Sequence, residues 1–423
     1  MEQYASRYEG QTKIARLMFI AERYLEKQGE SYKMAIDAIK LTKNTNLYRK
    51  VFEKIGDKLG SGYTFDSAWA DGIDKKAQVT HDELEALLNT YRQNLIRKKI
   101  RTGYNDLGAF HYDRGDFNAS LRSYIRTQDY CASEHMIEMC MHVIKVSIAM
   151  NNFVHVLTYV AKAESTPGIA TNKVVEAQLK VTAGLAHIEN RKYKAAAKKF
   201  IETSFELGNK FAEVISPQDV AIYGSVCALA EFDRRELKAE VLDNSQFQNY
   251  LELVPELGQC LNDFYNSKYA ECLAYLEKLK NDLLLDIHLY DHIQSLYEKV
   301  RTKALVQYFS PYTSVDLNKM ASAFQVTYPD LEKELSKLIV DGTISARIDS
   351  HNKRLYSREV DDRRETFNKA IQLGEDFQTD TRAMLIRVSL IRNNMLVKPQ
   401  KGEERRGGPG SGAGHTGKRT DKK

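Results

Sequence analysis

Proline and cysteine are both scarce in this chain of 423 residues. None of the seven prolines falls in the first 166 residues or between residues 330 and 398, and because proline interrupts helices, these stretches favour helix after helix. The five cysteines, an odd number without CxxC spacing, predict buried reduced thiols and neither a disulfide framework nor a zinc site. They are Cys131, Cys140, Cys227, Cys260 and Cys272.

Long apolar runs are also missing. No stretch of 18 consecutive apolar residues occurs, which argues against a membrane-spanning helix. The N-terminal sequence MEQYASRYEG contains no apolar signal-peptide core. These absences lead us to expect a protein of the nucleus and cytoplasm.

Neither sign of charge is in large excess, because the chain carries 62 basic and 57 acidic side chains. Residues 398–423 hold eight of the basic and three of the acidic ones, which leaves 54 of each sign in residues 1–397. That neutral body lacks the basic footprint typical of nucleic-acid binding. Residues 398–423 are also rich in glycine and almost free of apolar side chains, which predicts a disordered basic tail.

No coherent catalytic group of residues can be assembled from the sequence. There is no GxSxG motif, and the GxGxxG match at residues 412–417 lies in the tail, without the strand and helix that would present a phosphate site. His288 and His292 are four residues apart on a predicted helix, as in zinc sites, but the glutamate of HExxH is absent and no third ligand can be named. The same holds for His135 and His142. We therefore predict no enzyme activity, no metal and no cofactor.

A turn followed by an aromatic residue recurs along the helical region. The copies are Gly115-Asp116-Phe117, Asn151-Asn152-Phe153, Arg191-Lys192-Tyr193 and Ser267-Lys268-Tyr269. Their aromatic residues are 36, 40 and 76 positions apart, and 76 is two units of 38. Such a period predicts paired helices stacked as a solenoid of tetratricopeptide or HEAT type. We expect an earlier copy at Glu30-Ser31-Tyr32 and a degenerate one near residues 232–237.

The pattern also predicts one unusually long helix over residues 81–113. Its basic cluster, Arg97-Lys98-Lys99-Ile100-Arg101, is typical of a solvated helix face. A site for an acidic partner is the alternative.

Residues 305–358 predict a small winged-helix unit. Ser314 or Thr313 is a candidate cap for its first helix, and Pro329 lies near the start of its second. Alternating runs between residues 344 and 356 then predict a hairpin, which supplies the only strands that we expect. The residues predicted to form the core and interface of this unit are Leu317, Met320, Phe324, Leu331, Leu335, Leu338, Ile344, Ile348 and Tyr356.

The second helix of a winged helix often reads DNA. Here residues 328–341 hold four acidic and two basic side chains, so phosphates would repel this helix. The wing is more basic, with Arg347, Lys353, Arg354 and Arg358, so weak contact with nucleic acid stays open. We predict a surface that binds protein.

Residues 361–397 predict a long helix with a coiled-coil-like seam, because apolar residues recur at alternating steps of three and four. A lone helix must bury such a stripe. We expect a bundle with helices of other chains, although docking on its own domain is the alternative. The predicted interface residues are Phe367, Ile371, Phe377, Met384, Val388, Ile391 and Met395.

The sequence thus predicts a mainly α protein with a right-handed helical-repeat solenoid, a winged helix and a long C-terminal helix. The predicted domains are an N-terminal helical region (1–110), the solenoid (111–290), the winged helix (291–360), the bundle helix (361–397) and the tail (398–423).

Helical repeats that run into a winged helix are the layout of the PCI domain, which the proteasome lid, the COP-nine signalosome and a translation initiation factor share. Several segments resemble the PCI-domain family that forms subunit one of that signalosome. They are residues 129–131 (DYC), 143–147 (VIKVS), 162–167 (KAESTP), 220–224 (VAIYG), 227–230 (CALA), 232–234 (FDR), 281–286 (NDLLLD), 307–312 (QYFSPY) and 344–351 (ISARIDSH).

The resemblance implies a non-catalytic scaffold. Winged helices of several PCI subunits would pair edge to edge, and C-terminal helices would gather into one bundle. Removal of a ubiquitin-like modifier from cullins would belong to a metalloprotease subunit. The implied partners are that subunit, the other PCI-domain subunits and cullin-RING ligase components, without a membrane. Two alternatives stay open: a proteasome regulatory-particle lid subunit and a nucleic-acid-binding PCI protein.

Overall fold

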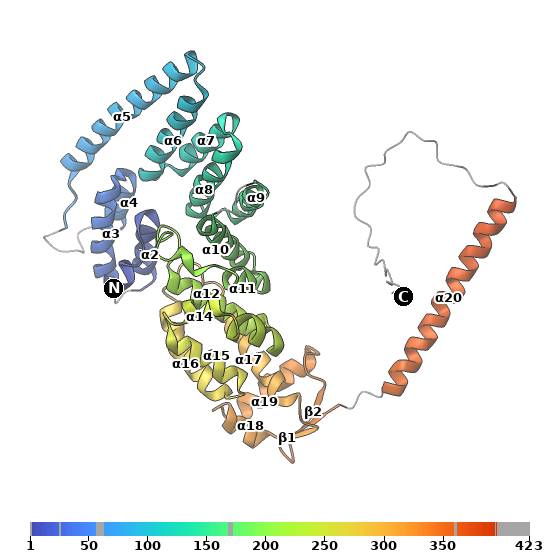
Figure 1. The fold of residues 1–423 in the computed structure, drawn as a ribbon. Helices are drawn as coiled ribbons and strands as arrows, with labels where there is room; N and C mark the ends of the chain where they lie inside the picture. The colour runs from blue at the N-terminus through green and yellow to red at the C-terminus, as the bar shows by residue number, and fades with distance from the viewer. Residues whose placement is uncertain are drawn as a thin grey trace. The chain divides into compact units, whose positions relative to one another are not determined.

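The structure is a computed structural model that describes residues 2–24, 27–55, 63–167, 172–358, 362–393 and 395 (Figure 1). It divides into two units, Met1–Ser357 and Arg358–Lys423. The first unit is mostly helical and ends in a small sheet, which confirms the predicted mainly α class. Within the described ranges, no helix is long and apolar enough to cross a membrane.

The first unit begins with a group of four helices that packs on the solenoid. Its helix α3 starts at Gln28, so Tyr32 lies within the second turn of the helix and does not open it, as the aromatic residue of a repeat copy should. The early repeat copy expected at Glu30-Ser31-Tyr32 is therefore wrong. The four helices are α1 (Glu2–Ala5), α2 (Gly10–Arg23), α3 (Gln28–Thr42) and α4 (Thr45–Ile55).

Residues 81–113, expected as one helix, belong to two. Helix α5 (Ser67–Gln93) ends at a turn where Leu95 has a φ of 54°, and α6 (Arg97–Asp113) then runs back beside it (Figure 1). The periodic pattern hid this reversal because neither glycine nor proline marks it. The basic cluster of residues 97–101 lies in the first turns of α6, where most of its side chains are exposed.

The recurring turn is the end of one helix and the start of the next. In all four copies the residue two positions before the aromatic has a left-handed φ, between 55° and 76°. The N–H that follows it donates to a carbonyl five positions earlier at 2.8–2.9 Å, which closes the helix end as a Schellman motif. The aromatic residue then opens α7 (Phe117–Arg126), α9 (Phe153–Glu164), α11 (Tyr193–Ile201) and α16 (Tyr269–Leu283).

Stacking of these helix pairs confirms the solenoid. Figure 1 shows α6 and α7, then α8 and α9, then α10 and α11 following one another. Close packing needs small residues: a Cβ added at Gly184 in α10 would lie 2.8 Å from the Phe200 ring of α11. The remaining helices of the stack are α8 (Ser133–Ala149), α10 (Lys173–Glu189) and α12 (Pro217–Glu231).

The degenerate copy expected near residues 232–237 has no left-handed turn among its described residues. Instead α13 (Arg234–Glu236) runs directly into a π-helical turn, Leu237–Leu242. Three more helices besides α16 lead to the winged helix, namely α14 (Ser245–Leu251), α15 (Pro255–Tyr265) and α17 (Ile293–Phe309).

The winged helix contains one strand more than expected. Its sheet has the order β1-β3-β2 with antiparallel pairs, and Val315 of β1 faces Leu355 of β3. Ser314 lies in β1, and Asp316 caps the first helix instead, since its side chain accepts the Asn318 N–H at 2.9 Å. Three residues are too few for alternation to reveal a strand. The elements are β1 (Ser314–Asp316), α18 (Leu317–Ala323), α19 (Tyr328–Val340), β2 (Ala346–Asp349) and β3 (Arg354–Ser357).

The second unit contains one long helix, α20 (Asp362–Arg392), in its described part. Met395, counted in the predicted seam, lies beyond the last helical residue, where its N–H donates to the Leu390 carbonyl at 3.0 Å. The predicted tail, residues 398–423, lies outside the described residues.

Candidate interaction surfaces

Most of the predicted winged-helix residues form a core. Seven of the nine are buried: Leu317, Met320, Phe324, Leu331, Leu335, Leu338 and Ile344. Ile348 is partly buried, and Tyr356 on β3 is 38% exposed. Because buried side chains cannot touch another chain, only Tyr356 and part of Ile348 can contribute directly to an interface. The interface role of this set stays a prediction.

The surface of the winged helix offers other groups that the sequence pattern did not single out. Val340 at the end of α19 is 86% exposed, and Tyr312 before β1 is 52% exposed. Strands β1 and β2 each pair only with β3 among the described strands, so each has an unpaired edge that could accept a further strand.

The charges of α19 do not suit nucleic acid. Asp330 is exposed on it, Glu332 is partly buried, and Glu334 is held by Arg301 of α17 at 3.0 Å. The exposed cations Arg347, Lys353 and Arg354 lie on the hairpin instead. An acidic second helix beside a basic wing favours a protein partner over a DNA groove.

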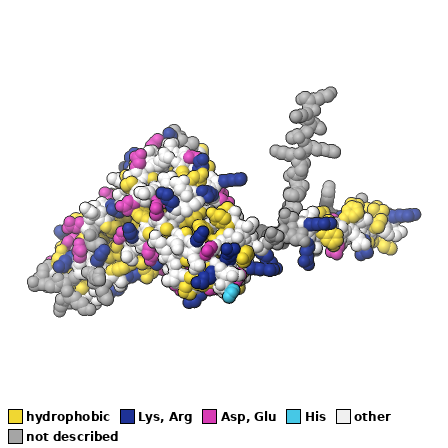
Figure 2. Space-filling view, turned by 90° about the horizontal axis from the view of Figure 1, so that it is seen from below, with side chains coloured by type: hydrophobic (Ala, Val, Ile, Leu, Met, Phe, Trp, Pro, Cys, Tyr) yellow, Lys and Arg dark blue, Asp and Glu magenta, His cyan; other side chains and the backbone are white. Residues whose placement is uncertain are grey.

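The seam of α20 is open in its own unit. Hydrophobic side chains lie on the surface of this helix, seen at the right of Figure 2. No described residue of the unit covers the predicted stripe, whose exposed fractions range from 47% to 74%. Its members on the helix are Phe367, Ile371, Phe377, Met384, Val388 and Ile391.

The sequence pattern missed a second set of apolar residues on α20. Leu385, Ile386 and Leu390 lie off the seam and are 65%, 61% and 37% exposed. Together with the seam they make the end of α20 apolar on most of its circumference. A helix that is apolar all round is normally buried on all sides. The sequence MLIRVSLI of residues 384–391 already shows this nearly continuous apolar run.

A buried ion cluster joins the N-terminal helices to the solenoid. Arg16 of α2 is 1% exposed, and its guanidinium lies 2.5 Å from Asp286 Oδ2 and 3.6 Å from Asp219 Oδ2. Tyr223 donates to Asp286 at 2.7 Å and Tyr8 donates to Asp219 at 2.7 Å. Because Asp219, Tyr223 and Asp286 are all far from α2 in sequence, this cluster holds α2 against the solenoid.

The two carboxyl groups of this cluster differ. Burial disfavours both charges, but the adjacent Arg16 outweighs burial at Asp286, so the pKa of Asp286 lies below its ordinary value. At Asp219, 3.6 Å from the guanidinium, burial dominates and raises the pKa. The cluster therefore works as one strong ion pair with a second, weaker carboxyl partner.

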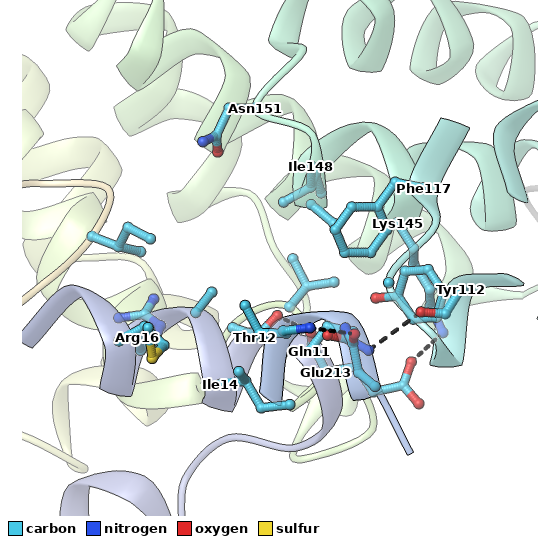
Figure 3. Close-up of a pocket in the computed structure, with 18 of the residues that line it drawn as sticks. Gln11, Thr12, Ile14, Arg16, Tyr112, Phe117, Lys145, Ile148, Asn151 and Glu213 are labelled. Carbon is cyan, nitrogen blue, oxygen red and sulfur yellow. Dashed lines mark hydrogen bonds and ion pairs between the residues drawn. The ribbon is translucent and has the colours of Figure 1, made fainter. Parts of the chain in front are cut away.

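A cavity of about 460 Å³ opens beside this cluster, between the N-terminal helices and the solenoid (Figure 3). One side is α2 with α4, and the other includes the turns that end α6 and α8. The Gln11 side chain bridges the two sides by donating to the carbonyls of Tyr112 and Asp113 at 3.3 and 3.1 Å. Lys145 and Glu213 form an ion pair of 2.5 Å on the solenoid side.

His288 and His292 both lie beside the carboxylate of Glu189. Glu189 of α10 lies 3.4 Å from His288 Nδ1 and 3.7 Å from His292 Nε2. Burial opposes the charge of Glu189, but its bonds to the two histidines prevail and lower its pKa to about 2. No set of three metal-binding side chains was found in the part of the chain that the structure describes.

The remaining motif residues have ordinary surroundings. His135 and His142 each lie near Glu138, at 3.8 and 3.9 Å. Cys131 is partly buried, and the other cysteines are buried, including the neighbours Cys260 and Cys272, whose sulfurs lie 3.0 Å apart.

Two family models match the chain: 26S proteasome subunit RPN7 over residues 66–240 and PCI domain over residues 276–359. COP9 signalosome complex subunit 1 of Arabidopsis thaliana is 51% identical to the chain, over 93% of this chain and 90% of its own length. The chain belongs to the COP9 signalosome subunit 1 family. Subunit 1b of Drosophila melanogaster is 37% identical, over 98% of this chain and 88% of its own length.

Membership of the subunit 1 family confirms the resemblance read from the sequence. The 26S proteasome non-ATPase regulatory subunit 6 of Oryza sativa subsp. japonica is only 25% identical, over 75% of this chain and 82% of its own length. The match to the RPN7 model therefore reflects a paralogous family. The match to the PCI model begins in α16 and includes the whole winged helix.

Proposed function

We propose that this signalosome subunit is a non-catalytic scaffold that joins the complex through its winged helix and α20. In this role it supports cullin deneddylation by a metalloprotease subunit, and so the regulation of cullin-RING ubiquitin ligases. Its partners are the other PCI-domain subunits, that metalloprotease and ligase components. It acts in the nucleus and cytoplasm.

The open seam of α20 carries this proposal. The helix has 31 residues and is therefore about 46 Å long. Burial of one large apolar side chain stabilises a complex by roughly 1.5–3 kcal/mol. Burial of a stripe of six or more such side chains against a partner would therefore bind that partner strongly. Other helices of the same kind would cover it best, since alternating steps of three and four are the spacing of helix bundles.

The winged helix supports the same role. Two unpaired strand edges, with exposed Tyr312 and Tyr356 close by in sequence, suit pairing with a neighbouring PCI subunit. The acidic α19 speaks against nucleic-acid binding as the main role. The lower identity to the proteasome subunit speaks against the lid alternative.

The test is mass spectrometry of the native complex purified on the tagged full-length chain. Two variants are purified in the same way for comparison. One is truncated after Val360, and the other has Ile371, Met384 and Val388 replaced by Asp. We expect the full-length chain to recover PCI subunits and a cullin-deneddylating metalloprotease, and both variants to lose them, because three buried charges cannot be accommodated in a bundle core.

A matched control adds the same charge to the opposite side of α20. In this variant Asn368, Gln372 and Thr379 are replaced by Asp, and we expect normal assembly. If the seam variant assembles normally, the bundle role is wrong. Recovery of proteasome ATPases would move the chain to the lid, and recovery of nucleic acid alone would favour the third alternative.

A further inference from the structure

The cavity between the N-terminal helices and the solenoid has the properties of a binding site. Its volume of about 460 Å³ falls within the range of pockets that hold small ligands or a few residues of a peptide. Its walls come from residues far apart in sequence, which the Arg16 cluster holds in place. The site is therefore preformed and independent of α20 and the winged helix.

The walls of the cavity are largely aliphatic. On the N-terminal side they include Ile14, Leu47 and Val51, and on the solenoid side Ile148 and Val214. Leu47 is only partly buried, so the cavity offers apolar surface that an aliphatic side chain could cover. Removal of this surface from water would supply the main driving force for binding.

Carboxamide groups stand among these apolar residues. Asn44, Asn46 and Asn151 line the cavity, and Figure 3 shows the Asn151 side chain extending toward it from the turn after α8. Asn44 is 5% exposed, and its Oδ1 accepts the Leu47 N–H at 3.0 Å. Its Nδ2 has no acceptor among the described residues, so this amide can donate a hydrogen bond to a ligand.

The position of the Asn44 amide is fixed by a glycine. A Cβ added at Gly115, where φ is 76°, would lie 2.1 Å from Asn44 Nδ2. The amide therefore packs against bare backbone and is held at the cavity wall. A carboxamide offers both a donor and an acceptor, which is the pair that a peptide group in an extended chain needs.

The charged side chains at the rim of the cavity include one more basic than acidic residue. Lys54 pairs with Glu22 at 2.6 Å, and Lys145 pairs with Glu213 at 2.5 Å. Lys50 is exposed at the rim and has no acidic partner among the residues that the structure describes. An acidic group on a ligand would complete this set of charges.

We propose that this cavity binds a short extended segment of a partner protein, with an aliphatic side chain next to an acidic one. The aliphatic side chain enters between Leu47 and Ile148, the Asn44 amide donates to a backbone carbonyl, and Lys50 pairs with the acidic side chain. This proposal does not rest on the proposed scaffold role, since it uses none of the surfaces assigned to assembly.

The test is selection of a displayed random hexapeptide library on the purified full chain. The counter-selection uses Ala149→Trp, in which an indole enters the cavity from the end of α8. We expect enriched peptides that combine Leu, Ile or Val with Asp or Glu. We also expect the enrichment to disappear on Ala149→Trp, with circular dichroism and melting showing that this variant is folded.

Fluorescence anisotropy with the enriched peptide then tests the charge. Lys50→Glu should weaken binding at least tenfold, whereas Lys40→Glu, an exposed change on α3 away from the cavity, should not alter it. The proposal is overturned if no peptide is enriched over Ala149→Trp, if the enriched peptides are basic, or if Lys50→Glu binds as well as the original chain. It is also overturned if a free dicarboxylic acid competes as strongly as the peptide.

Discussion

Replacement of Arg16 by Met should release the N-terminal helices from the solenoid. Met has a similar length and leaves no large void, so the change chiefly removes the charge and its hydrogen bonds. Those bonds go to Asp286 Oδ2, to the Tyr223 hydroxyl at 3.1 Å and to the Tyr4 hydroxyl at 3.0 Å. The variant leaves Asp286 buried without its cation.

Two arguments give the size of the effect. Loss of one partner of a buried ion pair generally costs about 3–5 kcal/mol, because the other charge is left without compensation. Asp286 can avoid being a buried charge by taking up a proton. Protonation of a carboxyl group with an ordinary pKa near 3.9 costs about 4 kcal/mol at pH 7. Because the two routes agree, we expect a loss of about 4 kcal/mol in the stability of the docked N-terminal group.

Hydrogen exchange measures this locally. Amides of α2 and α4 should exchange faster by a factor of several hundred in Arg16→Met, while those of α10 and α12 should change little. Asp286→Asn combined with Arg16→Met should recover about 2 kcal/mol, because an amide can stay hydrogen-bonded without a charge. Arg23→Met is the control, since Arg23 lies on the same helix but is exposed and stacks on Tyr290.

The reasoning is refuted if Arg16→Met lowers the stability of α2 by less than about 1 kcal/mol, or by no more than Arg23→Met does. It is also refuted if the double variant with Asp286→Asn is the less stable of the two. Either result would mean that apolar packing alone holds the N-terminal helices.

Three further predictions concern single residues. The pKa of Glu189 lies near 2 instead of 4.5, so its stabilising effect is present above pH 4.5 and is lost as the pH falls through 2. Glu189→Gln should therefore cost at most about 3 kcal/mol near pH 5 and almost nothing near pH 2, and a difference independent of pH in urea unfolding would contradict this. Gly184→Ala should destabilise by about 1–3 kcal/mol in thermal melting because the new methyl meets the Phe200 ring; an unchanged melting temperature would show that the ring can move aside. Gly374→Ala in α20, where a Cβ meets nothing within 4 Å, should instead favour the helix by about 1 kcal/mol in circular dichroism of the isolated chain, and a loss of helix signal would count against it.

The solenoid could be predicted because its signal is local. Each repeat turn needs a left-handed residue and then an aromatic that opens the next helix, and residues such as Asn151 and Gly115 suit that conformation. The turn at Leu95 has the same left-handed conformation but contains neither glycine nor asparagine at that position, so the sequence did not indicate it. Strand β1 was missed for a similar reason, because three residues form a strand only when β3 is there to pair with them.

The apolar stripe of α20 and the absence of a catalytic motif could also be read directly from the letters. The exposed positions near the winged helix could be read only in part. The helical spacing separated Leu338, which is 9% exposed, from Val340, which is 86% exposed, but Tyr356 was predicted together with the core and is 38% exposed. Only packing against the rest of the domain decides the exposure of such a strand residue.

The sequence by itself determined the class of fold, the repeat, the winged helix and the long C-terminal helix with its apolar stripe, since all of these depend on residues a few positions apart. Only the tertiary structure decided the pairing of Arg16 with Asp286, which are 270 positions apart, and of Tyr8 with Asp219, which are 211 apart. It also decided that Glu189 meets two histidines and that a cavity opens beside Asn44. The physical reason is that a buried charge or a cavity depends on which distant segments the packing brings together, and local periodicity carries no record of that.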